Sequence, residues 1–160
     1  MVANSISLTN RGIMPRTGQA ALLPNQPIIH GCLVSPTAVS ALVPGAVVAL
    51  ADDENLDDTI VIKQADIKDT PCGVVVYNAI KSAFVANDRV SVFPVGSFVY
   101  MTAGAANIKR GTKLQFTAEN KVVGTATAEQ GYVGIAWTSA ALEGDLIIVQ
   151  IQPSVEPKAA

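Results

Sequence analysis

The sequence predicts an all-β protein, a small β-barrel or sandwich of short antiparallel strands with an extended N-terminal arm. Three observations support this fold class. Ten short segments rich in Val, Ile, Thr and Tyr follow one another, with turn residues in the gaps. No long segment shows the apolar spacing of i, i+3, i+4 and i+7 that marks an amphipathic helix. Residues 1–27 follow neither pattern, and their prolines at positions 15, 24 and 27 favour extended backbone.

The chain of 160 residues is long enough for one domain with a substantial core. We divide it into an arm of residues 1–27, a β-domain of residues 28–152 and a short polar tail of residues 153–160. The strands expected in the domain are spaced by about a dozen residues, as in small barrels and sandwiches. In chain order they are Ile28–Val34, Val47–Ala51, Thr59–Gln64, Gly73–Asn78, Arg89–Phe93, Ser97–Thr102, Lys113–Thr117, Lys121–Ala128, Tyr132–Ser139 and Asp145–Gln152.

Several of these strands open with Gly or Asn, which tolerate positive φ and allow a tight turn into the strand. A longer echo relates residues 73–88 to residues 134–145, because both read strand, loop, turn, strand. Since β-hairpins converge on this order, the echo is poor evidence of duplication. It indicates a barrel that is built of hairpins.

The composition is apolar and poor in charge: 49% of residues are hydrophobic and 15% are charged, against about 25% charged in a typical soluble domain. Such a chain is not disordered. Asp, Lys, Pro or Gly interrupts every apolar run well short of ~18 residues, so no membrane span is expected. So few charges suggest that other copies or a partner cover much of the exterior.

Charge and targeting signals narrow the partners. The net charge is −2, and no basic cluster is longer than Lys109-Arg110. A nucleic-acid partner needs a basic face to neutralise its phosphates, so we expect neither nucleic acid nor membrane as a partner. Met1–Ser5 lacks the basic and apolar regions of a signal peptide, which predicts a protein made and used, or assembled, in the cytosol.

The sequence offers little for catalysis. His30 is the one histidine, and on a strand it could share a face with Cys32, but no third group or oxyanion motif accompanies them. A strand histidine at a rim or interface is therefore the preferred interpretation. His30, Cys32 and Cys72 are too few and wrongly spaced for a zinc site. We interpret the cysteines as buried thiols, with a disulfide possible in an oxidising compartment. We expect no catalytic residues, no cofactor and no enzymatic activity.

The densest charge lies in the stretch Asp52–Asp58. Carboxylates at alternating positions could ligate Ca²⁺, but the stretch lacks the Gly and Glu at the sixth and twelfth positions of an EF-hand loop. We interpret it as a solvated loop, and its like charges make it a poor surface for self-association. As metal ligands only these residues are candidates: Asp52, Asp53, Glu54, Asp57 and Asp58.

The succession of strands and turns resembles a known family. The residues that carry the resemblance are Gly45–Asp52, Cys72–Val76, Asn87–Val92, Gly111–Phe116, Gly124, Gly134–Ala136 and Glu143–Ile151. Over about residues 28–152 this pattern resembles the capsid cement, or head decoration, proteins of tailed bacteriophages. The resemblance implies a structural protein on the outer surface of the capsid, assembled in the host cytoplasm. It also implies a homotrimer at three-fold and quasi-three-fold positions that clamps the major capsid protein and stabilises the lattice.

The arm is the candidate interface in this interpretation. An extended segment can add to the sheet edge of a neighbour, and weak contacts repeated over a lattice sum through effective concentration. The candidate interface residues are Met14, Pro15, Arg16, Leu22, Leu23, Pro24 and Pro27. Two alternatives stay open: a small β-barrel module that binds glycan or Ca²⁺ through Asp52–Asp58, and another virion component such as a tail or fibre subunit.

Overall fold

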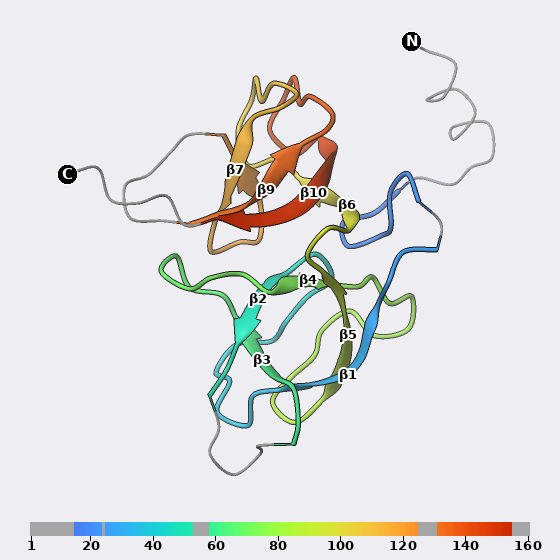
Figure 1. Cartoon of the computed structure of the whole chain (residues 1–160), viewed down its shortest axis with the longest axis vertical. Helices are drawn as coiled ribbons and strands as arrows, with labels where there is room; N and C mark the ends of the chain where they lie inside the picture. Colours follow the sequence, from blue (N-terminus) through green and yellow to red (C-terminus); the bar gives the residue numbers. More distant parts are fainter. Residues whose placement is uncertain (1–14, 24, 53–57, 125–130, 155–160) are drawn as a thin grey trace.

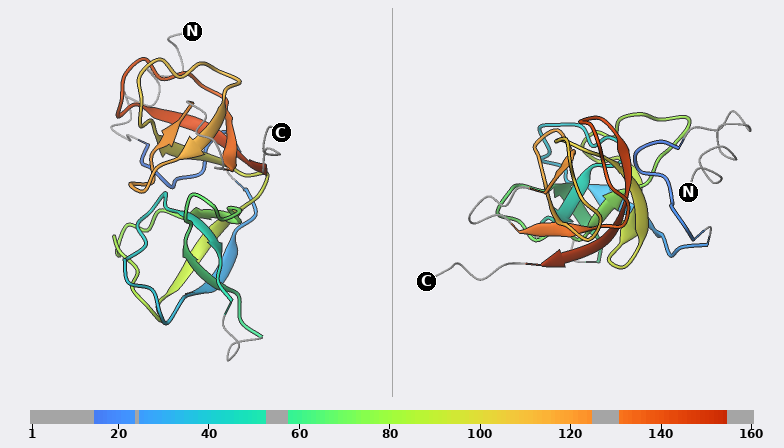
Figure 2. Two further views of the ribbon diagram at one scale, coloured as in Figure 1. Left: turned by 90° about the vertical axis from the view of Figure 1, so that its left-hand side faces the viewer. Right: turned by 90° about the horizontal axis from the view of Figure 1, so that it is seen from above.

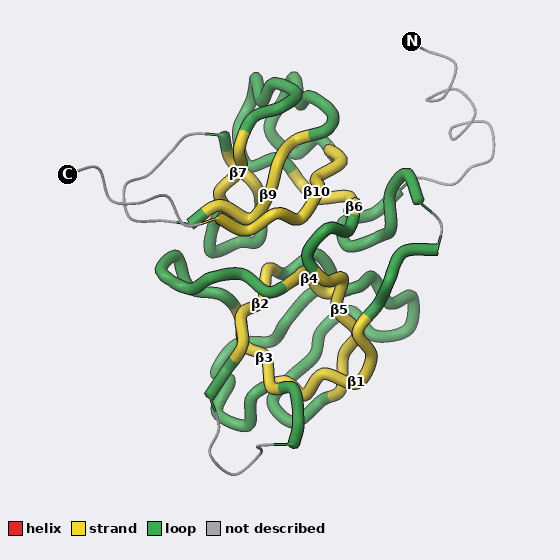
Figure 3. The backbone as a smooth tube through the Cα atoms, viewed as in Figure 1, coloured by secondary structure: helices red, strands yellow, loops and turns green. Residues whose placement is uncertain are grey.

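The computed structural model describes residues 15–23, 25–52, 58–124 and 131–154 and confirms the all-β fold. The strands form two groups that lie one above the other along the long axis of the molecule (Figure 1). The tube in Figure 3 shows that loops make up the rest of the described chain. None of the described residues forms a helix with the length and apolar character needed to cross a bilayer.

The first group is a closed five-stranded barrel with the order β1-β3-β2-β4-β5. Its strands are β1 (Ile29–Val34), β2 (Val47–Leu50), β3 (Val61–Gln64), β4 (Gly73–Val75) and β5 (Arg89–Pro94). Neighbouring strands are antiparallel except β1 and β3, which are parallel. Closure leaves no free edge along the paired parts of these strands.

The second group is a five-stranded sheet with the order β6-β10-β9-β7-β8. Its strands are β6 (Phe98–Thr102), β7 (Lys113–Phe116), β8 (Val122–Val123), β9 (Tyr132–Ala136) and β10 (Leu146–Ser154). Directly after β6, Ala103 bridges Val122 of β8 in parallel, so the two ends of the sheet meet. The second group therefore also curls into a barrel.

The two groups repeat one topology. In each, the first strand is antiparallel to the fifth and parallel to the third, and the fourth lies between the second and the fifth. The loop hydrogen bonds repeat as well: the Gly45 N–H donates to the Val75 carbonyl at 2.9 Å, and the Gly111 N–H donates to the Ala136 carbonyl at 2.7 Å. The echo between residues 73–88 and 134–145 is the β4–β5 hairpin and its counterpart, β9–β10.

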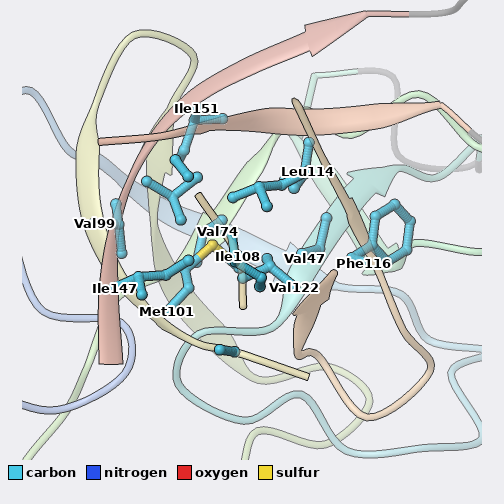
Figure 4. Close-up of a cluster of buried hydrophobic side chains, with 14 of the residues drawn as sticks. Val47, Val74, Val99, Met101, Ile108, Leu114, Phe116, Val122, Ile147 and Ile151 are labelled. Atoms are coloured by element: carbon cyan, nitrogen blue, oxygen red, sulfur yellow. The ribbon is translucent and has the colours of Figure 1, made fainter. Parts of the chain in front are cut away.

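The cores follow from strand alternation. In β2, Val48 points into the first barrel and Val47 points out of it, toward the second sheet. The interior of the first barrel holds Cys32, Val34, Leu42, Ala46, Val48, Ile62, Val75, Phe84, Val90 and Val92. A larger cluster joins the two halves (Figure 4) and includes Val47, Val74, Phe93, Val99, Met101, Leu114, Phe116, Ile147 and Ile151. Because alternate residues feed different cores, β4 is buried on both faces.

A polar contact also joins the halves. The turn between β7 and β8 carries Asn120 in the left-handed region, at φ 60°. Its Oδ1 accepts hydrogen bonds from the Val47 N–H at 3.2 Å and from Gln64 Nε2 at 2.5 Å. The turn thereby satisfies a backbone donor of β2 at the interface between the two halves.

The described part of the arm lies along the edge of β6. The Gly18 N–H donates to the Tyr100 carbonyl at 2.8 Å, and the Ala21 N–H donates to the Phe98 carbonyl at 2.9 Å. The Gly18 carbonyl accepts from the Tyr77 N–H at 2.8 Å, so this segment touches both halves (Figure 2). Residues 15–23 thus add to a sheet edge of their own chain.

Some strand ends differ from the expectation. β4 ends at Val75 and β9 at Ala136, earlier than the expected Asn78 and Ser139, because the chain there leaves the sheet to form the loops before β5 and β10. β10 continues to Ser154, two residues into the expected tail, because it still pairs with Tyr132. Of the expected strand Lys121–Ala128, residues 125–128 lie outside the described part of the chain.

Candidate interaction surfaces

Two exposed leucines stand on a turn where the arm leaves the edge of β6. The exposed fractions of Leu22 and Leu23 are 58% and 53%. Leu22 has a φ of 61°, in the left-handed region that costs a non-glycine residue energy. The Leu23 N–H donates to the Ala21 carbonyl at 2.6 Å and closes the turn. The turn presents both apolar side chains to solvent.

The side chain of Gln26 holds this turn in place. Its Nε2 donates to the Phe98 carbonyl at 2.7 Å and to the Ala21 carbonyl at 3.1 Å. Its Oε1 accepts a hydrogen bond from the Phe98 N–H. One amide thus clamps the base of the turn to the first residue of β6. We call Ala21–Gln26 the leucine turn; Pro24 within it lies outside the described residues.

The other candidate interface residues lie in different surroundings. Pro15 is half-buried and Pro27 is exposed, while Met14 is not among the described residues. Arg16 turns toward the first barrel, where its Nη1 donates to Tyr77 Oη at 2.6 Å and its guanidinium lies 5.4 Å from the ring centre. The structure therefore brings Leu22 and Leu23 together and separates Arg16 from them.

The acidic stretch is described only at its ends. Asp52 and Asp58 are exposed, while Asp53, Glu54 and Asp57 lie outside the described residues. Within the described ranges, no three His, Cys, Asp or Glu side chains gather as a metal site would require. The Ca²⁺ interpretation stays a hypothesis.

His30 and Cys32 lie on opposite sides of the barrel wall and do not share the face that residues two apart on a regular strand could share. Gly31, at φ 73°, introduces an irregularity in β1 that breaks the alternation. Cys32 is buried in the barrel, whereas exposed His30 has its Nδ1 3.0 Å from Ser91 Oγ outside it. The two residues therefore do not form a Cys–His pair.

Both cysteines are free thiols, and Cys72 packs against the core that contains Cys32. Burial raises the pKa of the Cys32 thiol, and burial with a smaller contribution from Cys32 raises the pKa of Cys72 to about 11. Thiols with such pKa values are protonated near neutral pH and are poor nucleophiles. Cys32 is buried, as the sequence predicts, whereas Cys72 is half-buried.

A pocket that the sequence did not predict lies where β1 and β5 meet the connection from β4 to β5. Its volume is about 220 Å³, and its lining consists of Gly31, Val76, Tyr77, Asn78, Phe84, Arg89, Val90 and Ser91. Arg89 Nη1 donates to the Gly31 carbonyl at 2.8 Å. We call it the arginine pocket. The signal in the sequence is Gly31, because an isolated glycine inside a strand pattern indicates a bulge or a close approach of the backbone.

A known protein family and a solved structure are similar to this chain. Residues 30–151 match the family described as phage cement protein. No curated protein sequence matches the chain closely enough to indicate a relationship. Among solved structures, the N base of the head fiber gp8.5 of bacteriophage phi29 is similar in fold, with a TM-score of 0.55 and 22% sequence identity. That similarity covers 82% of this chain and 99% of the other. The match to the family spans both barrels and most of the sequence, so the chain belongs to the phage cement protein family and is a structural protein of the virion.

Proposed function

We propose that this protein binds the outer surface of a phage capsid, contacts the major capsid protein and stabilises the lattice as a homotrimer at three-fold and quasi-three-fold positions. It joins the head in the host cytoplasm and acts without catalysis. The observation that carries the proposal is the family match over residues 30–151, which includes both barrels. The protonated thiols and the separation of His30 from Cys32 support a role without chemistry.

The leucine turn is the surface that we propose for the capsid contact. Leu22 and Leu23 offer apolar area that is removed from water when a partner covers it. Gln26 already holds the turn, so little conformational entropy is lost on binding. Pro27 restricts the backbone directly after the turn, because a proline fixes its own φ.

The test uses capsids from which the cement protein has been removed. Purified protein is added, and binding is measured by co-sedimentation, with the melting temperature of the capsid as a second readout. We expect saturable binding and a higher capsid melting temperature. Leu22→Asp combined with Leu23→Asp should weaken binding at least tenfold, whereas Leu142→Asp, at a leucine with 66% exposure in the β9–β10 loop, should bind normally. Wild-type protein that stays in the supernatant would refute the proposal.

A second candidate function is the base of a head fibre. The solved structure of similar fold is itself such a base, and the likeness covers 99% of it. Virions that lack this protein separate the two functions. Loss of capsid stability with intact surface fibres indicates cement, whereas loss of fibres with unchanged capsid stability indicates a fibre base.

A further inference from the structure

The arginine pocket exists because the first barrel departs from the repeat. In the second half, Val99, Tyr100 and Met101 of β6 face Val149, Ile148 and Ile147 of β10, one residue to one. In the first half, Ile29 faces Val92 and Cys32 faces Val90. Two residues of β1, His30 and Gly31, therefore oppose the single residue Ser91 of β5. At the corresponding position of β6 there is one residue, Tyr100. This is a β-bulge, a feature that often lies beside functional sites.

The residues around the bulge also change in chemistry. By the strand registers, Arg89 stands where the second half has Leu146, and Ser91 stands where it has Ile148. The connection from β4 to β5 covers residues 76–88, thirteen residues, whereas that from β9 to β10 covers residues 137–145, nine residues. The longer connection supplies Tyr77, Asn78 and Phe84 to the lining. Two apolar side chains of the second half, Leu146 and Ile148, thus correspond to two polar side chains of the pocket, Arg89 and Ser91.

Basic side chains surround this pocket. Arg89 lines it, Arg16 bonds Tyr77, and His30 contacts Ser91. Lys81 Nζ lies 5.6 Å from the ring centre of Phe84 and 2.7 Å from the carboxylate of Asp88. Asp88 is engaged by Lys81 and by the Val85 N–H. Arg89 lines the pocket and Arg16 lies beside it, and among the described residues no carboxylate forms an ion pair with either arginine.

A guanidinium presents donors in a planar fork that matches a carboxylate. The same chain carries five carboxylates between Asp52 and Asp58, in the connection from β2 to β3. In the closed barrel, the neighbours of β2 are β3 and β4, so β2 lies on the opposite side of the barrel from the β1–β5 pair. Asp52 and Asp58 are exposed and form no ion pair among the described residues. The chain thus holds complementary charges on different parts of one barrel.

We propose that the arginine pocket binds the side-chain carboxylates of Asp52 and Asp58 from a second copy of this chain. The proposal rests on the homo-oligomer of the proposed function and deepens it by naming the two surfaces that meet. Like charges keep two acidic stretches apart, so each finds the cation-lined surface of a neighbour. A contact between two different surfaces is head-to-tail, and such contacts close into a ring when the rotation permits. Three copies around a three-fold axis form such a ring.

The test measures association of the full-length protein by sedimentation equilibrium at low salt. Arg89→Glu should weaken association at least tenfold, and so should Asp52→Lys combined with Asp58→Lys. All three substitutions in one chain should restore most of the association, because the charges then complement each other in the opposite sense. Arg110→Glu, at an exposed arginine of the second half, is the matched control and should associate as wild type does.

Three results would overturn the inference: a monomeric wild type, an Arg89→Glu variant that associates normally, or a triple variant without recovery. Capsid binding is measured on the same proteins. If Arg89→Glu weakens capsid binding at unchanged association, the pocket faces the capsid and this inference is wrong while the proposed function stands. If the wild type associates through these surfaces but ignores capsids, the proposed function fails and the inference stands.

Discussion

Asp88 and Asp145 occupy the same position in the two halves and make the same turn. Oδ2 of Asp88 accepts from the Val85 N–H at 2.7 Å, and Oδ2 of Asp145 accepts from the Leu142 N–H at 2.9 Å. The Asp88 N–H donates back to the Val85 carbonyl at 3.0 Å, and the Asp145 N–H donates back to the Leu142 carbonyl at 3.4 Å. Each aspartate therefore closes the loop that leads into the last strand of its barrel.

The carboxylate of Asp88 should make stability depend on acid pH. The hydrogen bond from Lys81, followed by the Val85 N–H, lowers the pKa of Asp88 below its ordinary value of 3.8. A group with a depressed folded-state pKa stabilises the fold above its unfolded pKa, and the contribution is lost as pH falls through the folded value. We expect Asp88→Asn to lower the melting temperature at pH 7, and to lower it by progressively less as the pH falls below 3.8. A loss that does not shrink with falling pH would contradict this account.

The core shared by the two halves should couple their unfolding. Phe93 of β5 is 2% exposed and packs in the cluster that contains Met101 and Ile147 of the second half. Replacing a buried Phe by Ala costs about 3–5 kcal/mol. We expect Phe93→Ala to lower the free energy of unfolding in urea by that amount, with one transition for both halves. Val39→Ala, at a fully exposed side chain, is the control. Two separate transitions in the wild type would show that the halves unfold independently.

A glycine in β9 is required by a close approach of backbone. A Cβ on Gly134 would lie 2.1 Å from the Gln150 carbonyl oxygen of β10. Because the obstacle is backbone, the strands must separate to admit it, and we expect Gly134→Ala to cost about 1–3 kcal/mol by analogy with overpacked cores. Gly31→Asn should cost much less, since the space around Gly31 is open and Asn tolerates positive φ. Urea unfolding measures the free energy of unfolding of both variants. Equal decreases in the two variants would contradict the steric argument.

The thiol of Cys72 predicts an alkaline limit to stability. Burial raises the pKa of Cys72 from 9.0 to about 11 in the folded protein. The protonated thiol favours the folded state below the unfolded pKa, and this contribution is lost as pH rises from about 9 through about 11. We expect Cys72→Ser to flatten the fall in melting temperature over that range. Iodoacetamide should label the native thiols slowly at pH 8 and the urea-unfolded thiols quickly; fast native labelling would contradict burial.

Much of the fold was predictable because strands have a recognisable pattern in the local sequence. Each expected strand overlaps a strand of the structure, since short β-branched runs bounded by turn residues are its direct signature. The exposed leucines were also predictable as candidates, because Leu22 and Leu23 lie among prolines outside any strand pattern. Their contact with a capsid stays a prediction.

The arginine pocket was not predictable in the same way. It depends on Arg89, Ser91 and the bulge at His30-Gly31 meeting across two strands far apart in the chain. The residues are visible in the sequence, but their juxtaposition depends on a register that one extra residue changes. The repeat that makes the bulge recognisable appears only when β6 and β10 are seen paired one residue to one.

Sequence patterns alone indicate that the chain is all-β, where its strands and turns lie, and which family it resembles. Local patterns suffice for these, because the pleat and the turns depend on residues close in the chain. Three features are visible only in three dimensions: ten strands form two barrels of one topology, residues 15–23 lie on β6 of their own chain, and His30 and Cys32 face opposite ways. Those features depend on which distant strand supplies each hydrogen-bond partner. Because the backbone N–H group is the same in every residue except proline, the sequence does not specify that partner.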